Sequence, residues 1–315
     1  MKPMNIAFCV NNSYIPYITV AIKSIAEIHR HCDVCIHVLT DKISESNRRR
    51  LAETIEGYDH ITTEIHIVDA TLLKGVKTGV WTIYAWYRIL LPELLPSDIK
   101  KVLYLDADTL VVDDLSELFL IDMTSIAIAA ALDPMSSDEF AFERCGYKSD
   151  KKYICSGILL MNLEYWREKG LAKMLVDWAN SNSERIMFPD QDAINYVCRD
   201  TKIILPLRFG ILNGFFKNDI FYKDEYAEQL RDCIERPAII HYAGCYPWIR
   251  FFATHLMQNE WEKYNKMLRH SVVIEWIPRK WVYVKVLLWQ LLHPSKKSKN
   301  ITLDDVKRRL SEYGA

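Results

Sequence analysis

The sequence lacks the glycine-rich loops with which many α/β proteins hold nucleotide phosphates. Only 10 of its 315 residues are glycine, no G-x-G-x-x-G follows the first apolar run at residues 5–10, and no P-loop is present. The turn after that run is instead Asn11-Asn12-Ser13. A nucleotide bound to this chain would therefore need another source of positive charge for its phosphates, such as a metal ion.

Long hydrophobic runs are also missing. No segment reaches the ~18 consecutive apolar residues needed to span a bilayer, and no secretory signal is recognisable at the N-terminus. The cysteines are scattered, at positions 9, 32, 35, 145, 155, 198, 233 and 245. The lone pair Cys32-x-x-Cys35 lacks the context of a zinc or redox motif, because there is no second pair and it opens an apolar run at 34–39. We therefore expect reduced thiols and a cytoplasmic protein.

A strong charge of one sign is absent from the chain as a whole. The 40 Lys and Arg nearly balance the 41 Asp and Glu, which gives a net charge of −1, so no nucleic-acid partner is expected. The charge is nevertheless unevenly distributed. Residues 266–315 hold 11 Lys and Arg against 4 acids, a balance of +7, and the preceding 265 residues have a balance of −8. This split indicates a partner for the basic end.

What the sequence does contain is an alternation of strand-like and helix-like periodicity. Apolar runs predict strands near residues 5–10, 35–39, 64–68, 101–112, 126–132, 154–162 and 238–242. Amphipathic spacing predicts helices near residues 17–29, 44–55, 82–91, 171–181, 191–197 and 304–313. Alternation over the first hundred residues favours an α/β fold with a parallel, Rossmann-like sheet.

Two carboxylates, Asp106 and Asp108, directly follow the apolar residues of the 101–112 run. An unpaired buried carboxylate is strongly disfavoured, and open α/β sheets bind ligands at the carboxyl ends of their strands. The pair therefore predicts a site for a divalent cation, which prefers oxygen ligands. A solvated turn after a strand would carry the same residues, so this motif alone leaves both interpretations open.

Five short blocks in this order resemble a known family. They are residues 8–14, 104–110, 156–163, 190–195 and 241–244, the last followed by Pro247-Trp248. Together they are similar to family 8 glycosyltransferases of the GT-A fold, close to bacterial lipopolysaccharide and capsule galactosyl- and glucosyltransferases. The resemblance implies a GT-A, Rossmann-like nucleotide-sugar-binding domain with a mixed central sheet over residues 1–265. It also implies transfer of glucose or galactose from a UDP-sugar to a glycan or glycolipid acceptor, with retention of configuration.

The resemblance implies a metal site and a donor site. Asp106, Asp108 and His241 match the ligands of a manganese (or magnesium) ion, although a lone His that ends an apolar strand is often structural. Asn11, Ser13 and Tyr14 match the loop that binds uridine, although such polar residues also form ordinary turns. The remaining donor-binding positions are Arg88, Ala107, Asp133, Cys155, Ser156 and Gly244, with Asp106 shared between the two sites. An ordinary arginine on the exposed face of a helix would have the same sequence pattern as Arg88.

The catalytic residues implied by the resemblance are Asp190, Gln191 and Asp192. One of the two acids could instead cap the start of the helix. Retention needs either a carboxylate nucleophile or same-face attack through a short-lived ion pair, and the sequence does not decide between them. Because an amide is a poor nucleophile, we favour same-face attack, with Gln191 beneath the anomeric carbon.

Two departures from the family pattern affect the donor site. Cys155 stands where the family usually has Asn, and the segment from His241 to Trp248 is one residue shorter and lacks the lysine that binds diphosphate. Lys217 or Arg250 could substitute for that lysine. The departures support one alternative function, a catalytically weak relative that only binds a nucleotide sugar or glycan. A nucleotidyltransferase, the other alternative, would want a glycine- and basic-rich loop near the N-terminus, and none is there.

The tail at residues 266–315 combines its positive balance with Trp276, Trp281 and Trp289. This composition is typical of a segment that lies on an anionic membrane surface, with its tryptophans at headgroup depth. We therefore expect a helical C-terminal extension and a peripheral association with the inner face of the plasma membrane. The alternative is that Val282–Leu292 packs on the catalytic domain or forms an oligomer interface.

Overall fold

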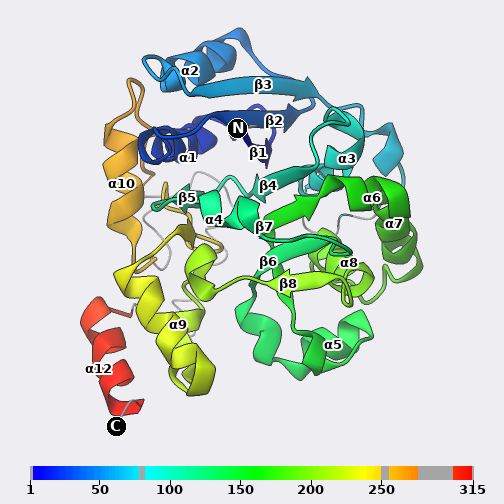
Figure 1. Cartoon of the computed structure of the whole chain (residues 1–315), viewed down its shortest axis with the longest axis vertical. Helices are drawn as coiled ribbons and strands as arrows, with labels where there is room; N and C mark the ends of the chain where they lie inside the picture. Colours follow the sequence, from blue (N-terminus) through cyan, green and yellow to red (C-terminus); the bar gives the residue numbers. More distant parts are fainter. Residues whose placement is uncertain (1–2, 77, 79–81, 250–254, 276–300, 314–315) are drawn as a thin grey trace.

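A computed structural model describes residues 3–76, 78, 82–249, 255–275 and 301–313 (Figure 1). Several residues discussed above lie outside the described residues, namely Arg250, Trp276, Trp281, the segment 282–292 with Trp289, and lysines 296, 297 and 299. In the part that the structure does describe, no helix is both long and apolar enough to cross a membrane.

A seven-stranded sheet forms the centre of the molecule, in the order β3-β2-β1-β4-β7-β6-β8 (Figure 1). Its strands are β1 (Met4–Cys9), β2 (Val34–Thr40), β3 (Ile61–Ile67), β4 (Lys101–Leu105), β6 (Ile128–Leu132), β7 (Ile154–Asn162) and β8 (Lys202–Ile204). Each of these strands runs parallel to the others except β7, which pairs antiparallel with both β4 and β6. The sheet is therefore mixed, and the reversed β7 begins at the edge where β4 ends.

Helices cover both faces of this sheet and create two apolar cores. One face packs against α1 (Ile15–Ile28) and α2 (Glu45–Ile55). The other face packs against η2 (Ile83–Leu90), α3 (Leu91–Leu94), α6 (Leu163–Lys169), α7 (Leu171–Ser181) and α8 (Pro189–Val197). Alternate residues of a strand serve the two cores, with Ile6 in the first and Ala7 in the second, because side chains alternate across a sheet.

The segment predicted as a helix at 82–91 forms the 3₁₀ helix η2 rather than an α-helix. The N–H of Leu91 bonds to the carbonyl of Arg88, three residues back. Pro92 has no N–H with which to make the α-helical bond to that carbonyl. The tighter turn carries Arg88 on the buried side of the segment.

A small second sheet, β5-β10-β9, stands beside the end of β4. It contains β5 (Thr109–Val111), β10 (Ile239–His241) and β9 (Ile211–Leu212). The antiparallel pairing of β5 with β10 places His241 opposite Thr109, and the N–H of Tyr242 donates to the carbonyl of Asp108 at 2.9 Å. His241, which is 133 positions after Asp108 in the chain, is thereby brought to the Asp106–Asp108 turn.

The remaining elements are short and surround these sheets. They are η1 (Ala70–Leu73), α4 (Ser116–Leu120), η3 (Pro134–Ser137), α5 (Glu139–Cys145), η4 (Ser149–Lys151), η5 (Leu207–Phe209), η6 (Phe215–Lys217), η7 (Asp219–Tyr222), α9 (Asp224–Glu235), α10 (Gln258–Lys266) and α12 (Leu303–Tyr313).

Part of the basic tail packs on the rest of the chain. Helix α12 lies beside α9 and η7, at the lower left of Figure 1. Val306 and Leu310 are buried in the same apolar cluster as Trp248 and Trp261. The guanidinium of Arg309 lies 3.8 Å from the ring centre of Tyr222. The described residues on the two sides of position 265 therefore share one core.

Candidate functional site

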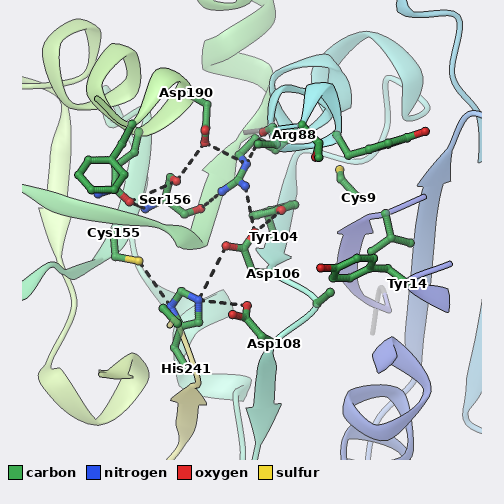
Figure 2. Close-up of a pocket in the computed structure, with 18 of the residues that line it drawn as sticks. Cys9, Tyr14, Arg88, Tyr104, Asp106, Asp108, Cys155, Ser156, Asp190 and His241 are labelled. Carbon is green, nitrogen blue, oxygen red and sulfur yellow. Dashed lines mark hydrogen bonds and ion pairs between the residues drawn. The ribbon is translucent and has the colours of Figure 1, made fainter. Parts of the chain in front are cut away.

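A cavity of about 480 Å³ opens at the carboxyl ends of β1 and β4. Figure 2 shows its side chains converging from β4, η2, β7, α8 and the end of β10. The expected site residues that line it are Asn11, Tyr14, Arg88, Asp106, Ala107, Asp108, Asp133, Cys155, Ser156, Asp190, Gln191, His241 and Gly244. Two other expected residues, Ser13 and Asp192, are not among its lining residues.

Asp106, Asp108 and His241 form one corner of this cavity. One ligating atom from each lies within 4.8 Å of the others. His241 Nε2 is 3.3 Å from Asp108 Oδ1 and 3.8 Å from Asp106 Oδ2 (Figure 2). Two carboxylates and an imidazole at this spacing form a donor set that accepts manganese.

Gly157 of β7 leaves room for this corner. A Cβ atom at this position would lie 2.4 Å from His241 Cε1 and 2.7 Å from Asp106 Oδ2. Both distances are too short for non-bonded atoms, so any larger residue would push the imidazole or the carboxylate away. The Gly157 backbone also contributes, because its carbonyl accepts the N–H of Asp106 at 2.8 Å.

Cys155 holds the far side of the His241 ring. Its Sγ lies 3.5 Å from His241 Nδ1, which leaves Nε2 directed towards the two aspartates (Figure 2). Burial lowers the pKa of His241, but Cys155 and Asp108 raise it more, so its pKa lies well above the usual value. The cysteine that replaces the family's usual asparagine thus contacts the imidazole and lines the cavity.

Arg88 links the corner formed by Asp106, Asp108 and His241 to Asp190 and Ser156. Its Nη2 donates to Asp106 Oδ1 at 2.9 Å, its Nε lies 3.3 Å from Asp190 Oδ2, and its Nη1 donates to the carbonyl of Ser156. Its guanidinium also lies 4.3 Å from the ring centre of Tyr104. Burial raises the pKa of Asp106, but Arg88 and His241 outweigh that effect and leave the pKa lowered. The arginine is therefore a buried member of the site and not an exposed helix residue.

Gln191 is held in a single orientation. Its Oε1 accepts the N–H of Ser156 at 2.9 Å, and its Nε2 donates to Asp133 Oδ2 at 3.1 Å and to the hydroxyl of Tyr153 at 3.2 Å. These partners fix which end of the amide carries oxygen. The neighbouring Asp190 accepts the Ser156 hydroxyl at 3.0 Å, and burial raises its pKa although Arg88 opposes this shift.

Asp192 has different surroundings from Asp190. It is fully buried, pairs with Arg144 at 2.8 Å and accepts the Tyr153 hydroxyl at 2.6 Å. Its other oxygen accepts the N–H groups of Met187 and Phe188 at the start of α8. Burial raises the pKa of Asp192, but these partners lower it below the usual value. This carboxylate therefore stabilises the start of α8 and does not line the cavity.

Aromatic side chains stand at the nucleoside end expected for Asn11 and Tyr14. The ring centre of Tyr14 lies 6.2 Å from that of Trp248, and Tyr246 stacks on the same indole at 5.5 Å. Asn11 Oδ1 accepts the N–H groups of Ser13 and Tyr14 at 2.9 and 3.1 Å. Ser13 is therefore held in the turn by Asn11 and is not among the residues that line the cavity.

Several residues line the cavity although they were not predicted as site residues from the sequence. Among them are Cys9, Thr82, Tyr84, Tyr104, Phe188, Leu212 and Tyr246. Tyr104 could have been predicted, because it stands two positions before Asp106 and residues two apart on a strand point to the same face. Its hydroxyl donates to Asp106 Oδ1 at 2.5 Å. Lys217, one of the two residues expected to replace the missing lysine, is exposed and is not among the lining residues.

Comparison with known proteins identifies the family to which this chain belongs. The model of glycosyl transferase family 8 matches residues 5–251. The chain belongs to this family. The family predicted from the five sequence blocks is therefore confirmed, and the protein is a glycosyltransferase of family 8.

Two relatives and a solved structure show how this family 8 member compares. Glycosyltransferase GlyF of Streptococcus pneumoniae serotype 4 is 28% identical over 82% of this chain and 60% of GlyF. Lipopolysaccharide 1,2-glucosyltransferase of Escherichia coli K12 is 23% identical over 82% of this chain and 79% of that protein. Galactosyltransferase LgtC, solved with donor and acceptor sugar analogues, has a TM-score of 0.73 at 26% identity, covering 89% of this chain and 99% of LgtC. The chain spans only three fifths of GlyF, and the likeness to LgtC confirms the GT-A fold.

Proposed function

We propose that this glycosyltransferase is a retaining, metal-dependent enzyme that moves glucose or galactose from a UDP-sugar to a glycan or glycolipid acceptor, such as lipopolysaccharide or capsule. The proposal is carried by one observation, the convergence of Asp106, Asp108 and His241 with Gln191 on a single cavity. The names of its relatives, a lipopolysaccharide glucosyltransferase and a galactosyltransferase bound to donor and acceptor analogues, support the substrate class.

The side chains at the metal corner fit a manganese or magnesium ion. Asp106 and Asp108 offer carboxylate oxygens, His241 offers Nε2, and Gly157 leaves the space in front of them open. When bound there, the ion would stabilise the charge that develops on the departing diphosphate.

The rest of the cavity divides between the two ends of the donor. We assign the uridine to Asn11 and Tyr14, and to the backbone near Ala107 and Gly244, because an aromatic ring stacks on a base and an amide bonds to its edge. We assign the hexose to the opposite wall, which is lined by Arg88, Asp133, Cys155, Ser156 and Asp190.

Same-face attack is the mechanism that these residues support best. Gln191 Oε1 lies beside the sugar wall and would stabilise positive charge at the anomeric carbon. Asp190 is paired with Arg88 and Ser156, which keeps its carboxylate in place rather than free to attack. We therefore propose that the leaving diphosphate accepts the acceptor's proton and that Asp192 acts through α8 as a positioning residue.

Release of UDP tests this function. The full chain is incubated with UDP-glucose or UDP-galactose and Mn²⁺, with and without EDTA, beside Asp108→Ala. We expect release from one of the sugars, its loss in EDTA, and its loss in the variant while the melting temperature without metal stays unchanged. Full activity in EDTA would contradict the metal dependence. Stabilisation by a UDP-sugar without any release would favour the weak binding relative, whose support is Cys155 and the missing lysine.

We further propose that residues 1–265 act as the catalytic domain and that the basic tail brings them to an anionic membrane surface. This membrane proposal is supported by the net charge of +7 over residues 266–315 and by the three tryptophans of the same segment. Replacing Lys296, Lys297 and Lys299 by Glu should weaken sedimentation with phosphatidylglycerol vesicles. The same replacement of three catalytic-domain lysines, 100, 148 and 173, is the control. Equal binding by both triple variants would contradict the membrane proposal.

A further inference from the structure

A second cluster of metal-ligating side chains lies on β2 and β3, away from the donor cavity. Cys35, His37 and Glu64 each present a ligating atom within 4.8 Å of one another. His66 extends the group, with its Nε2 3.1 Å from His37 Nδ1 and 3.8 Å from Glu64 Oε2. The parallel register pairs His37 with Glu64, so these side chains share one face of the sheet. None of the four is among the residues that line the cavity.

The hydrogen bonds of Asn5 fix the tautomer of His37. Asn5 Nδ2 donates to the carbonyl of Pro3 at 3.1 Å, so Asn5 Oδ1 is the end that faces His37 Nε2 at 2.9 Å. An amide oxygen only accepts, hence Nε2 carries the hydrogen and neutral His37 holds a lone pair on Nδ1. The side chain of His37 is fully buried, and this lone pair points at Glu64 and His66. Imidazoles that bind metals are commonly oriented in this way by a second hydrogen bond.

The separations among the ligating atoms of His37, Glu64 and His66 suit zinc. His37 Nδ1 lies 3.4 Å from Glu64 Oε2, beside the 3.1 and 3.8 Å separations that involve His66. Ligands about 2.0–2.2 Å from a tetrahedral zinc ion are separated by about 3.3–3.6 Å. The thiol of Cys35 lies within 4.8 Å of the ligating atoms of His37 and Glu64, and a small side-chain shift would let it join His66 on one ion. A set of two imidazoles, a carboxylate and a thiolate favours zinc over magnesium or calcium.

We propose that Cys35, His37, Glu64 and His66 form a structural zinc site that fastens the edge strand β3 to β2. Glu64 and His66 are the partly exposed ligands, with side-chain exposures of 53% and 18%, and they give the ion a path from solvent. Zinc bound only to the folded state would stabilise the sheet at this edge. The site uses one cysteine of the Cys32-x-x-Cys35 pair, since Cys32 lies in the turn before β2.

Cobalt substitution tests the proposal through the thiolate. Titrating the full chain with Co²⁺ should produce a thiolate-to-cobalt charge-transfer band, which the oxygen and nitrogen ligands of the Asp106 corner cannot give. The band should disappear in Cys35→Ser and persist in Cys155→Ser. No band in the wild type, or a band that persists in Cys35→Ser, would overturn the proposal.

Zinc affinity provides a second readout that does not depend on the cysteine variant folding. Glu64→Gln and His66→Asn lie at partly exposed positions of β3 and should each weaken zinc binding at this site at least about tenfold, measured by competition with a chromophoric chelator. Asn5→Ala should weaken it by about 10–100-fold, because the tautomer of His37 is no longer fixed. The control is His31→Asn, which removes an exposed histidine beside Asp114. Equal zinc binding by wild type, Glu64→Gln and His66→Asn would refute the site.

Discussion

Gly157 leaves little room for any larger residue beside Asp106 and His241. We expect Gly157→Ala to abolish the increase in melting temperature caused by Mn²⁺ and to lower activity at least about 100-fold, because the new Cβ displaces His241 or Asp106. Gly210→Ala is the matched control. Its Cβ would lie 2.2 Å from that of Ala131, so it is equally overpacked, yet Gly210 does not line the cavity. The control should lose stability and keep its Mn²⁺ response.

Asp190 and Asp192 are two residues apart and should respond differently to the same change. Asp190→Asn should lower kcat strongly with little loss of stability, since its carboxylate lies on the cavity wall. Asp192→Asn should destabilise the fold by about 3–5 kcal/mol, because it leaves the buried Arg144 without its partner. Urea unfolding and initial rates separate the two effects. A larger loss of stability in Asp190→Asn would mean that the roles are reversed.

The strands and helices show how far periodicity predicts this fold. The predicted bounds of β7 and α7 match the structure, and Ser44 caps α2, with its hydroxyl accepting the N–H of Asn47. The reversal of β7 could not be predicted from its residues, because a strand buried on both faces has the same composition in either direction. The short β9 offered no periodicity to detect, since it has only two residues.

Helix α12 supplies a test of whether the described part of the tail belongs to the core. Leu310→Ala should destabilise the protein by about 2 kcal/mol, because Leu310 is 6% exposed within a large apolar cluster. Leu303→Ala is the same substitution on the same helix at a position that is 40% exposed, and it should change stability by less than about 0.5 kcal/mol. Equal effects in chemical denaturation would mean that α12 is not held by its buried face.

For the whole molecule, buried neutral histidines predict acid sensitivity. His255 Nε2 donates to the carbonyl of Ile211 and its Nδ1 accepts the N–H of Met257, while burial, with His241 and Lys217 adding to it, lowers its pKa to about 3. Between about pH 3 and 6.5 the unfolded chain therefore binds a proton that the folded chain does not. Stability should fall as the pH decreases through this window, and His255 alone should contribute about 2 kcal/mol of loss between pH 7 and 5.

A variant separates this contribution from those of other groups. In urea unfolding, the free energy of unfolding of the wild type minus that of His255→Gln should be smaller at pH 5 than at pH 7 by about 2 kcal/mol. His241, with its raised pKa, has the opposite dependence, so the total slope alone would not be informative. A difference between the two proteins that stays constant with pH would show that His255 can be protonated in the folded state.

The candidate site was predictable only where a sequence motif carried it. Asp106 and Asp108 are adjacent to a recognisable strand, and the family resemblance supplied His241 and Gln191. The contact between Cys155 and His241 was not predictable, because it depends on β7 and β10 meeting across 86 positions of sequence. The cluster at Cys35 was missed for a related reason, since His37 and His66 face each other only through the register of two strands.

The balance of charge in the cavity bears on the order in which substrates bind. Four carboxylates line it, those of Asp106, Asp108, Asp133 and Asp190, against two basic side chains, Arg88 and His241, the latter with its raised pKa. A nucleotide diphosphate arriving alone would enter a field of its own sign, whereas a cation would be drawn in. Initial-rate kinetics should therefore show compulsory order, with the metal ion binding before the nucleotide sugar. Cellular occupancy of the donor site would then follow the free concentration of the ion as closely as that of the sugar nucleotide.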